Sequence, residues 1–120
     1  MRLYGIRGAT TTTENTATAI LQETEKLMLE LIKENNLTED KVVSIIFTTT
    51  PDLTAEFPSK ACRNLGWNQV ALLGSVEADV PHGIPYCIRV LIQAYLDSPE
   101  NLQHIYLNEA VRLRPDRAGR

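Results

Sequence analysis

The sequence predicts a single domain in which one layer of helices covers a β-sheet. Three observations lead to this prediction. An amphipathic helical segment lies near the N-terminus, and short β-branched or apolar runs follow it. The 120 residues can bury one hydrophobic core but are too few for two. No internal repeat or linker divides the chain. We therefore expect one domain over residues 1–116, in the order β-α-β-α-β-α-β, and a mobile polar tail over residues 117–120.

The N-terminal third is expected to form a strand, a turn and a long helix. Residues 2–7 are typical of a short strand, and Gly8 with the threonines after it is expected to turn the chain out of that strand. Thr13 is the expected N-cap, because its hydroxyl can accept a hydrogen bond from an unpaired amide of the first turn. Apolar residues then recur at helical spacing over residues 14–36. Residues 38–40 form a turn or a short helical cap.

Two strands and a helix are expected in the middle of the chain. Residues 42–48 are β-branched and almost continuously apolar, which is typical of a strand covered on both faces. A Pro-Asp pair ends this strand. Pro58 suits the first turn of a helix that reaches Gly66, and residues 69–74 form the third strand.

A third helix and a fourth strand are expected toward the C-terminus. Pro85 can open a helix, and the apolar residues that follow it as far as Tyr95 fall on one helical face. Residues 104–107 form the fourth strand. Residues 111–114 form either a short strand or an irregular return.

Composition narrows the classes of function. The formal net charge of −3 argues against nucleic-acid binding. No apolar run approaches the ~20 residues that span a bilayer, and no secretory segment opens the sequence, so we expect a cytoplasmic protein without a membrane partner.

Cys62 and Cys87 lie among apolar neighbours without CxxC spacing, which favours buried free thiols over a disulfide or a nucleophile. His82 and His104 are too scattered to indicate a metal site.

Arginine is unusually frequent among the basic residues. The chain has eight Arg and four Lys, and arginine is the side chain that recognises carboxylate or phosphate with two parallel hydrogen bonds. Arg7 is expected at the C-terminal end of the first strand, where α/β-type sheets commonly bind ligands. The segment has too few glycines for a dinucleotide site. An arginine exposed at the sheet edge is the alternative.

Arg89 interrupts the apolar run of the expected third helix. With Tyr86 and Gln93 it falls on one side of that helix, either as a solvated stripe or as the lining of a cleft. Glu77 and Asp79 follow the third strand. Two carboxylates at this spacing could suggest acid–base catalysis. An exposed loop is the simpler interpretation, because an extended chain would project both carboxylates to the same side, with nothing to set one apart as the acid and the other as the base.

Other basic residues occur in pairs. Lys60 and Arg63 are three apart on one helical face, either as a solvated pair or as a mouth that steers an anion. Arg112 and Arg114 share a face if their segment is extended.

The sequence contains no serine–histidine arrangement, metal cluster, phosphate loop or lysine in an apolar setting. An enzyme built from these residues needs a reaction that requires only charge and positioning.

Five segments together resemble the monofunctional, barrel-type chorismate mutases. They are GIRGATT over 5–11, TPDL over 50–53, FPSKA over 57–61, CIRV over 87–90, and the stretch from Tyr106-Leu107 to Asp116. They occur in the family's order and near its spacing, over almost the whole chain. The resemblance implies an α+β domain with a mixed sheet, assembled as a homotrimer with a barrel-like core and with each active site between two subunits.

The resemblance also implies a reaction. These enzymes convert chorismate, a small dicarboxylate, to prephenate on the way to phenylalanine and tyrosine. The reaction is an intramolecular Claisen rearrangement that needs no covalent intermediate, proton transfer, metal or cofactor. It therefore fits a sequence without an evident nucleophile.

Motif positions assign roles to individual residues by resemblance. Arg89, Glu77 and Arg7 would be catalytic. Arg7 and Tyr106 would hold the carboxylate of the enolpyruvyl side chain, Arg89 would donate to the ether oxygen, and Glu77 would accept from the ring hydroxyl. Further positions would contact the substrate or shape the mouth of the site, partly from a neighbouring chain: Phe57, Lys60, Arg63, Leu72, Leu73, Gly74, Ser75, Leu113 and Arg114.

The sequence departs from the family at the ring-hydroxyl end of the site, and two alternatives to this function remain. The family's cysteine a few residues before the glutamate is replaced by Gly74, so either that contact is lost or Ser75 supplies it. A trimeric module of similar fold that binds a carboxylate metabolite, for regulation or imine removal, is the second candidate. A purely structural oligomer, which predicts no saturable ligand, is the third.

Overall fold

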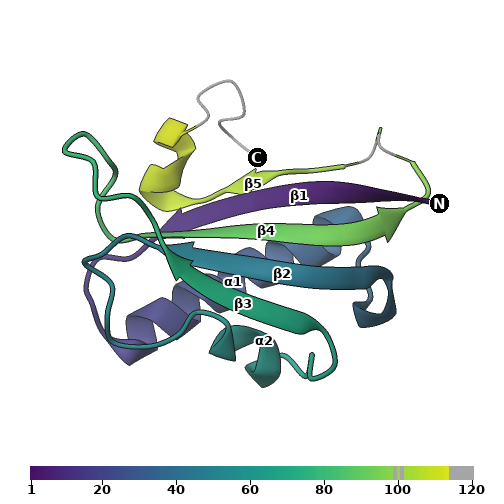
Figure 1. The fold of residues 1–120 in the computed structure, drawn as a ribbon, viewed down its shortest axis with the longest axis horizontal. Coiled ribbons are helices and arrows are strands. Elements are labelled where there is room, and N and C mark those ends of the chain that lie inside the picture. The colour runs from purple at the N-terminus through teal and green to yellow at the C-terminus, as the bar shows by residue number, and fades with distance from the viewer. Residues whose placement is uncertain (99, 101, 114–120) are drawn as a thin grey trace.

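A mixed five-stranded sheet with helices on one face forms the domain (Figure 1). The computed structural model describes residues 1–98, 100 and 102–113. The strands are β1 (Arg2–Thr11), β2 (Val42–Thr49), β3 (Ala71–Val76), β4 (Cys87–Leu96) and β5 (Ile105–Tyr106). Their order in the sheet is β3-β2-β4-β1-β5. β4 is antiparallel to both of its neighbours, whereas β3 is parallel to β2 and β5 is parallel to β1. The α+β fold with a mixed sheet is therefore confirmed.

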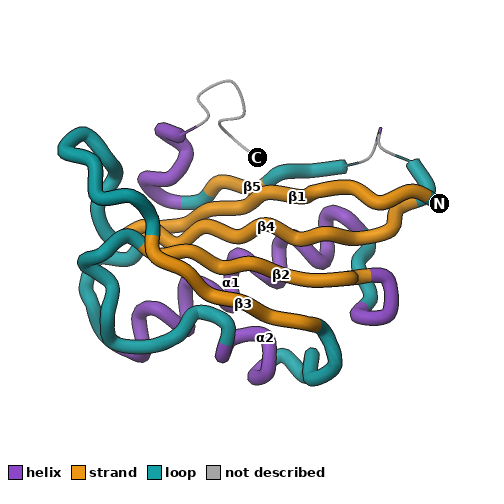
Figure 2. Tube along the Cα trace, in the orientation of Figure 1, coloured by secondary structure: helices purple, strands orange, loops and turns teal. Residues whose placement is uncertain are grey.

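The described chain has two α-helices, α1 (Ala17–Asn35), which runs behind the strands in Figure 2, and α2 (Lys60–Asn64), which lies below β3 in the same view. Two short 3-10 helices accompany them, η1 (Glu39–Lys41) and η3 (Asn108–Leu113). Within the described part of the chain, no helix combines the length and apolarity needed to cross a membrane. The predicted tail over 117–120 lies outside the described residues.

The hydrophobic core lies between α1 and the sheet. α1 contributes Leu27, Met28 and Leu31, none of which is exposed to solvent. Burial of one such side chain stabilises the fold by about 1.5–3 kcal/mol. The sheet contributes alternate residues of its central strands, namely Ile6, Ile45, Phe47, Val90 and Ile92. Side chains at the intervening positions of these strands point to the opposite face, which neither α-helix of the described chain covers.

The segment expected to be the third helix is strand β4, so that prediction was wrong. Ile88, Val90 and Ile92 are buried against the core and alternate with Arg89 and Leu91 on the other face. Helical spacing fitted the segment only because both faces of the strand carry apolar residues. β-Branched side chains at every second position favour the strand. Arg89 therefore projects from a sheet and not from a helix.

β1 continues through Gly8 to Thr11, so the expected turn at Gly8 was also wrong. A Cβ at Gly8 would lie 2.8 Å from Leu31 Cδ1 and 3.2 Å from Leu27 Cδ1. Glycine at this position thus lets α1 lie close against the sheet. Because the strand is longer, the helix starts later: Thr16, and not Thr13, caps it by accepting from the Ala19 amide at 3.1 Å.

Gly8→Ala is expected to lower the free energy of unfolding by about 1–3 kcal/mol, because the added methyl overpacks the contact between β1 and α1. Urea unfolding followed by circular dichroism measures the change. Gly5→Ala is the matched control on the same strand, since its Cβ would meet Leu91 Cδ1 at an ordinary 3.4 Å. Equal stability of the two variants would contradict this account of Gly8.

Other elements shift at their ends. The middle helix is only α2, five residues long, and the third strand begins and ends two residues later than expected. The fourth strand is confirmed at Ile105–Tyr106, while the segment after it is the 3-10 helix η3 rather than an extended return. The prediction that β2 is covered on both faces was wrong for the single chain, because the side chains on its second face are half-buried or exposed. That second face carries part of the candidate site.

Candidate active site

A cavity of about 360 Å³ lies on the face of the sheet opposite α1. Its volume is within the range of small-molecule sites. Four strands, the residue that follows β3, and η3 contribute to it. The lining residues are Arg7, Gly8, Ala9, Ile46, Thr48, Glu77, Arg89, Val90, Leu91, Tyr106 and Leu113.

Strand register brings the lining residues together. Arg89 on β4 is opposite Ala9 on β1 and Thr48 on β2, and Ala9 is in turn paired with Tyr106 on β5. Paired residues project to the same face of a sheet, so these four form one row across it. Arg7 is two residues before Ala9 and therefore points to the same face. The sheet thus places two guanidinium groups and a phenol beside one cavity.

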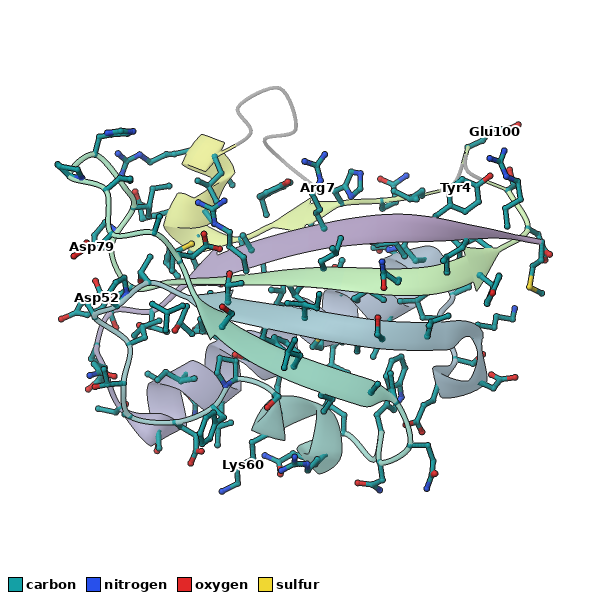
Figure 3. All side chains as sticks on the ribbon, in the orientation of Figure 1. Tyr4, Arg7, Asp52, Lys60, Asp79 and Glu100 are labelled. Carbon is teal, nitrogen blue, oxygen red and sulfur yellow. The ribbon has the colours of Figure 1, made fainter. Side chains whose placement is uncertain are left out.

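Arg7 reaches this cavity from the middle of β1 and not from the strand's end. Its side chain is exposed and projects from the sheet beside β5, as Figure 3 shows. The backbone N–H of Arg7 donates to Nδ1 of His104 at 2.9 Å, just before β5. This bond ties β1 to the segment that carries Tyr106.

Glu77 is held next to Arg89 by the end of β2. Its backbone N–H donates to the carbonyl oxygen of Thr49 at 2.8 Å, and its Oε2 accepts from the hydroxyl of Thr48. Nε of Arg89 lies 3.7 Å from the same Oε2, an ion pair that is too long for a hydrogen bond. The side chains of Arg89 and Glu77 are 46% and 27% exposed, so the pair is solvated and weak. This ion pair therefore does not prevent Arg89 from binding a ligand.

The C-terminal segment closes one side of the cavity. Tyr106 is only 6% exposed, and the N–H of Leu107 donates to the carbonyl of Ala9 at 2.9 Å. Asn108 has a left-handed φ of 55°, and its side-chain amide donates to the Thr11 carbonyl at 2.9 Å. This turn directs η3 back over β1, which brings Leu113 to the cavity. Arg114, also predicted to be at the site, lies outside the described residues.

Several predicted site residues lie apart from this cavity in the single chain. Phe57 is 74% exposed, and Lys60 and Arg63 belong to α2, on the helix-covered side of the sheet. Figure 3 shows Lys60 far from Arg7. Phe57, Gly74 and Ser75 border a second cavity of about 490 Å³ between β3 and the loop before α2. Leu72 and Leu73 lie on β3 and line neither cavity.

Thr48, Ile46 and Leu91 line the cavity but were not identified from the sequence. Each lies within an apolar strand segment, where the sequence gives no sign of which face is open. Strand pairing between β2 and β4 is what places them beside Arg89. Asp79 does not line the cavity and lies in an exposed loop, as the simpler interpretation predicted.

The two cysteines are free and buried, which confirms their interpretation as structural thiols. Burial, together with the charge of Glu39, raises the pKa of Cys62 from 9.0 to about 12. Burial also raises the pKa of Cys87, although the neighbouring Arg89 opposes the shift. A nucleophilic cysteine needs a lowered pKa, so neither thiol suits that role. Among the described residues, no three potential ligand side chains gather to hold a metal ion.

Raised thiol pKa values predict a loss of stability in alkali. Unfolded Cys62 releases its proton near pH 9.0, whereas the folded thiol keeps it to about pH 12. The unfolded state therefore binds fewer protons in that window, and the free energy of unfolding falls as pH rises through it. In urea titrations with reductant at about pH 7.5 and about pH 10.5, Cys62→Ala should lose less stability than the parent. An identical loss in both proteins would contradict the prediction.

Comparisons with known proteins agree on one family. The chain matches the family described as chorismate mutase type I over residues 3–117. It is 45% identical over 114 residues to chorismate mutase AroH of Thermus thermophilus, with 93% of each chain covered. Identity to chorismate mutase AroH of Bacillus subtilis (strain 168) is 43% over 118 residues, covering 97% of this chain and 93% of the relative. The solved chorismate mutase from Clostridium thermocellum has a TM-score of 0.87 and 47% identity, covering 89% of this chain and 96% of that structure.

Proposed function

The chain belongs to the type I chorismate mutase family of isomerases, and from this identity we propose how its cavity rearranges chorismate to prephenate. The observation that supports the proposal is the convergence of Arg7, Arg89 and Glu77 on one cavity. Two fixed cations and one carboxylate suit a dianionic substrate that also carries a hydroxyl group. The proposed mechanism needs only charge and positioning.

Arg7 and Tyr106 bind the carboxylate of the enolpyruvyl side chain. Arg7 presents a planar fork that can donate two parallel hydrogen bonds to a carboxylate. Tyr106 is nearly buried on the adjacent strand and can donate a third from its hydroxyl. This clamp holds the side chain over the ring, so the two carbon atoms that must bond are kept close together.

Arg89 stabilises the transition state. As the C–O bond of the ether breaks and the new C–C bond forms, negative charge develops on the ether oxygen. A guanidinium already in place there interacts more strongly with the transition state than with the substrate. One preorganised donor of this kind lowers the barrier by about 3–4 kcal/mol.

Glu77 fixes the other end of the substrate. Its carboxylate is an acceptor only, which suits the donated hydrogen of a ring hydroxyl. Because Glu77 lies against Arg89, the contact also sets the distance between the ring and the guanidinium. A cavity with donors for the carboxylate and an acceptor for the hydroxyl selects the compact conformer that can react.

We also propose that the active protein is a homotrimer whose sites lie between subunits. Leu73 and Val76 on the edge strand β3 are 64% and 66% exposed, and Phe57 nearby is 74% exposed. Apolar exposure along a sheet edge is typical of an interface. An interface would also give Lys60 and Arg63 a role. They do not line the cavity of their own chain, but in a trimer they can reach the cavity of a neighbouring chain.

The proposed cellular compartment is the cytoplasm. The free cysteines Cys62 and Cys87 fit a reducing environment.

Incubation with chorismate tests the function. Loss of the diene absorbance, with prephenate formed in equal amount and without added metal or cofactor, is the expected result. Saturable binding of chorismate without conversion would instead support the carboxylate-binding module. Absence of both would leave only the structural oligomer.

Mixing two variants, each lacking one residue of the proposed shared site, tests whether the site lies between subunits. Subunits carrying Arg89→Ala and subunits carrying Lys60→Ala should regain part of the parent activity when refolded together, because some interfaces then hold both intact residues. Refolding each variant alone is the control. No recovery in a mixture shown to be trimeric by sedimentation would contradict sites between subunits.

A further inference from the structure

We propose that Thr48 is a positioning residue that holds Glu77 apart from Arg89, and this inference rests on the proposed function. Thr48 lines the same cavity as Glu77 and Arg89. Thr48 is opposite Arg89 in the register of β2 and β4, and it is paired with Ser75, two residues before Glu77, on β3. Thr48 therefore lies between β4, which carries Arg89, and β3, which leads to Glu77.

One carboxylate oxygen of Glu77 lies near both Thr48 and Arg89. Oε2 of Glu77 accepts the hydrogen bond from Thr48, while Nε of Arg89 stays 3.7 Å from that same atom. A free arginine and glutamate at this distance would close into a pair with two parallel hydrogen bonds. The hydrogen bond from Thr48 fixes the position of Oε2 at this distance, so the carboxylate does not move toward Arg89. The ion pair therefore stays open.

An open pair matters for the substrate. The N–H groups of Arg89 remain available to the ether oxygen, and Oε1 of Glu77 remains available to the ring hydroxyl. If the pair closed, chorismate would have to break it before binding. The cost would then appear mainly as a raised KM, because the free enzyme is the state that is stabilised.

The backbone supports the same arrangement. The N–H of Glu77 donates to the carbonyl of Thr49, so the glutamate is tied to β2 through both its main chain and its side chain. Thr49 is buried, and its side chain points to the helix-covered face, because neighbouring residues of a strand alternate. Thr49 is thus a matched control for substitutions at Thr48.

The experiment compares three variants in the chorismate assay. Thr48→Val keeps the shape and removes the hydroxyl, and kcat/KM should fall about tenfold, mostly through KM, as for loss of one hydrogen bond to a charged group. Thr48→Ser restores the hydroxyl and should recover to within about threefold of the parent. Thr49→Val should match the parent. If Thr48→Val is unstable in thermal unfolding, Thr48→Ala replaces it in the series.

Two further measurements separate positioning from packing. In a Glu77→Gln background, Thr48→Val should change kcat/KM less than about twofold, because no ion pair is left to hold open. A crystal structure of Thr48→Val should show the distance from Arg89 to Glu77 shortened from 3.7 Å to hydrogen-bond length. This second readout is independent of turnover, so it decides the role of Thr48 even if the parent fails to convert chorismate. An unchanged distance, failed recovery by Thr48→Ser, or an equal loss in both backgrounds would overturn the proposal.

Discussion

Arg89→Ala is expected to lower kcat for chorismate about a thousandfold, because it removes the donor at the oxygen where charge develops. KM should change far less, since the clamp formed by Arg7 and Tyr106 is untouched. Steady-state kinetics that follow the diene absorbance of chorismate give both constants. The fold should survive, because the Arg89 side chain is half-exposed and its ion pair is weak.

The control for this prediction is another exposed arginine. Arg112 on η3 forms an ion pair with Glu109 at 3.8 Å and is not among the described residues that line the cavity. Arg112→Ala should therefore retain nearly full activity. Normal turnover by Arg89→Ala, or an equal loss in the Arg112 variant, would contradict the assigned role.

Arg7→Ala is expected to lower kcat/KM about a hundredfold, mainly by raising KM. Two charge-assisted hydrogen bonds to a carboxylate are lost, each stabilising the complex by about 1.5–3 kcal/mol before the site relaxes. Arg7→Lys should recover only part of the loss, because a point charge on a flexible stem replaces a rigid fork. The same kinetic assay separates the constants.

The division of the lost activity between kcat and KM is the sharper test. In our account Arg7 acts on substrate and transition state alike, whereas Arg89 acts on the transition state. A loss in Arg7→Ala confined to kcat, with KM unchanged, would contradict a binding role. Retained affinity of the variant for chorismate in equilibrium dialysis would lead to the same conclusion.

Much of the fold could be predicted from local patterns, since α1, β2 and the strand near Tyr106 each have a clear period or composition. β4 could not, because its second face carries Leu91 beside Arg89 and therefore satisfies helical spacing as well as alternation. The length of β1 was missed for a related reason. Gly8 suggests a turn in isolation, and only the packing of α1 against it shows that the glycine serves a close contact.

The site was predicted by resemblance to a family rather than by pattern. Spacing alone allowed a solvated position for Arg89, and it gave no reason to connect Arg89 with Glu77 or Tyr106. These residues come from three separate strands or strand ends, so the register of the sheet decides their proximity. Thr48 was missed because a threonine in an apolar strand is indistinguishable from ordinary β-sheet composition. The family itself is confirmed by its match over residues 3–117.

A second set of predicted residues lies apart from the cavity of its own subunit. Phe57, Lys60 and Arg63 do not meet the cavity of their own subunit. In the proposed trimer, these residues complete the mouth of a partner's site. The single-chain fold places them on α2 and the loop before it, and the proposed assembly would bring them to the partner's cavity.

The most direct test of the central claim is kcat for Arg89→Lys at saturating chorismate. Lysine keeps the positive charge but loses the planar, rigid arrangement of donors. If catalysis depends on a guanidinium fixed at the ether oxygen, kcat should fall by about a hundredfold or more while the substrate still binds. A kcat within about threefold of the parent would show that any nearby cation suffices, and would contradict the role assigned to Arg89.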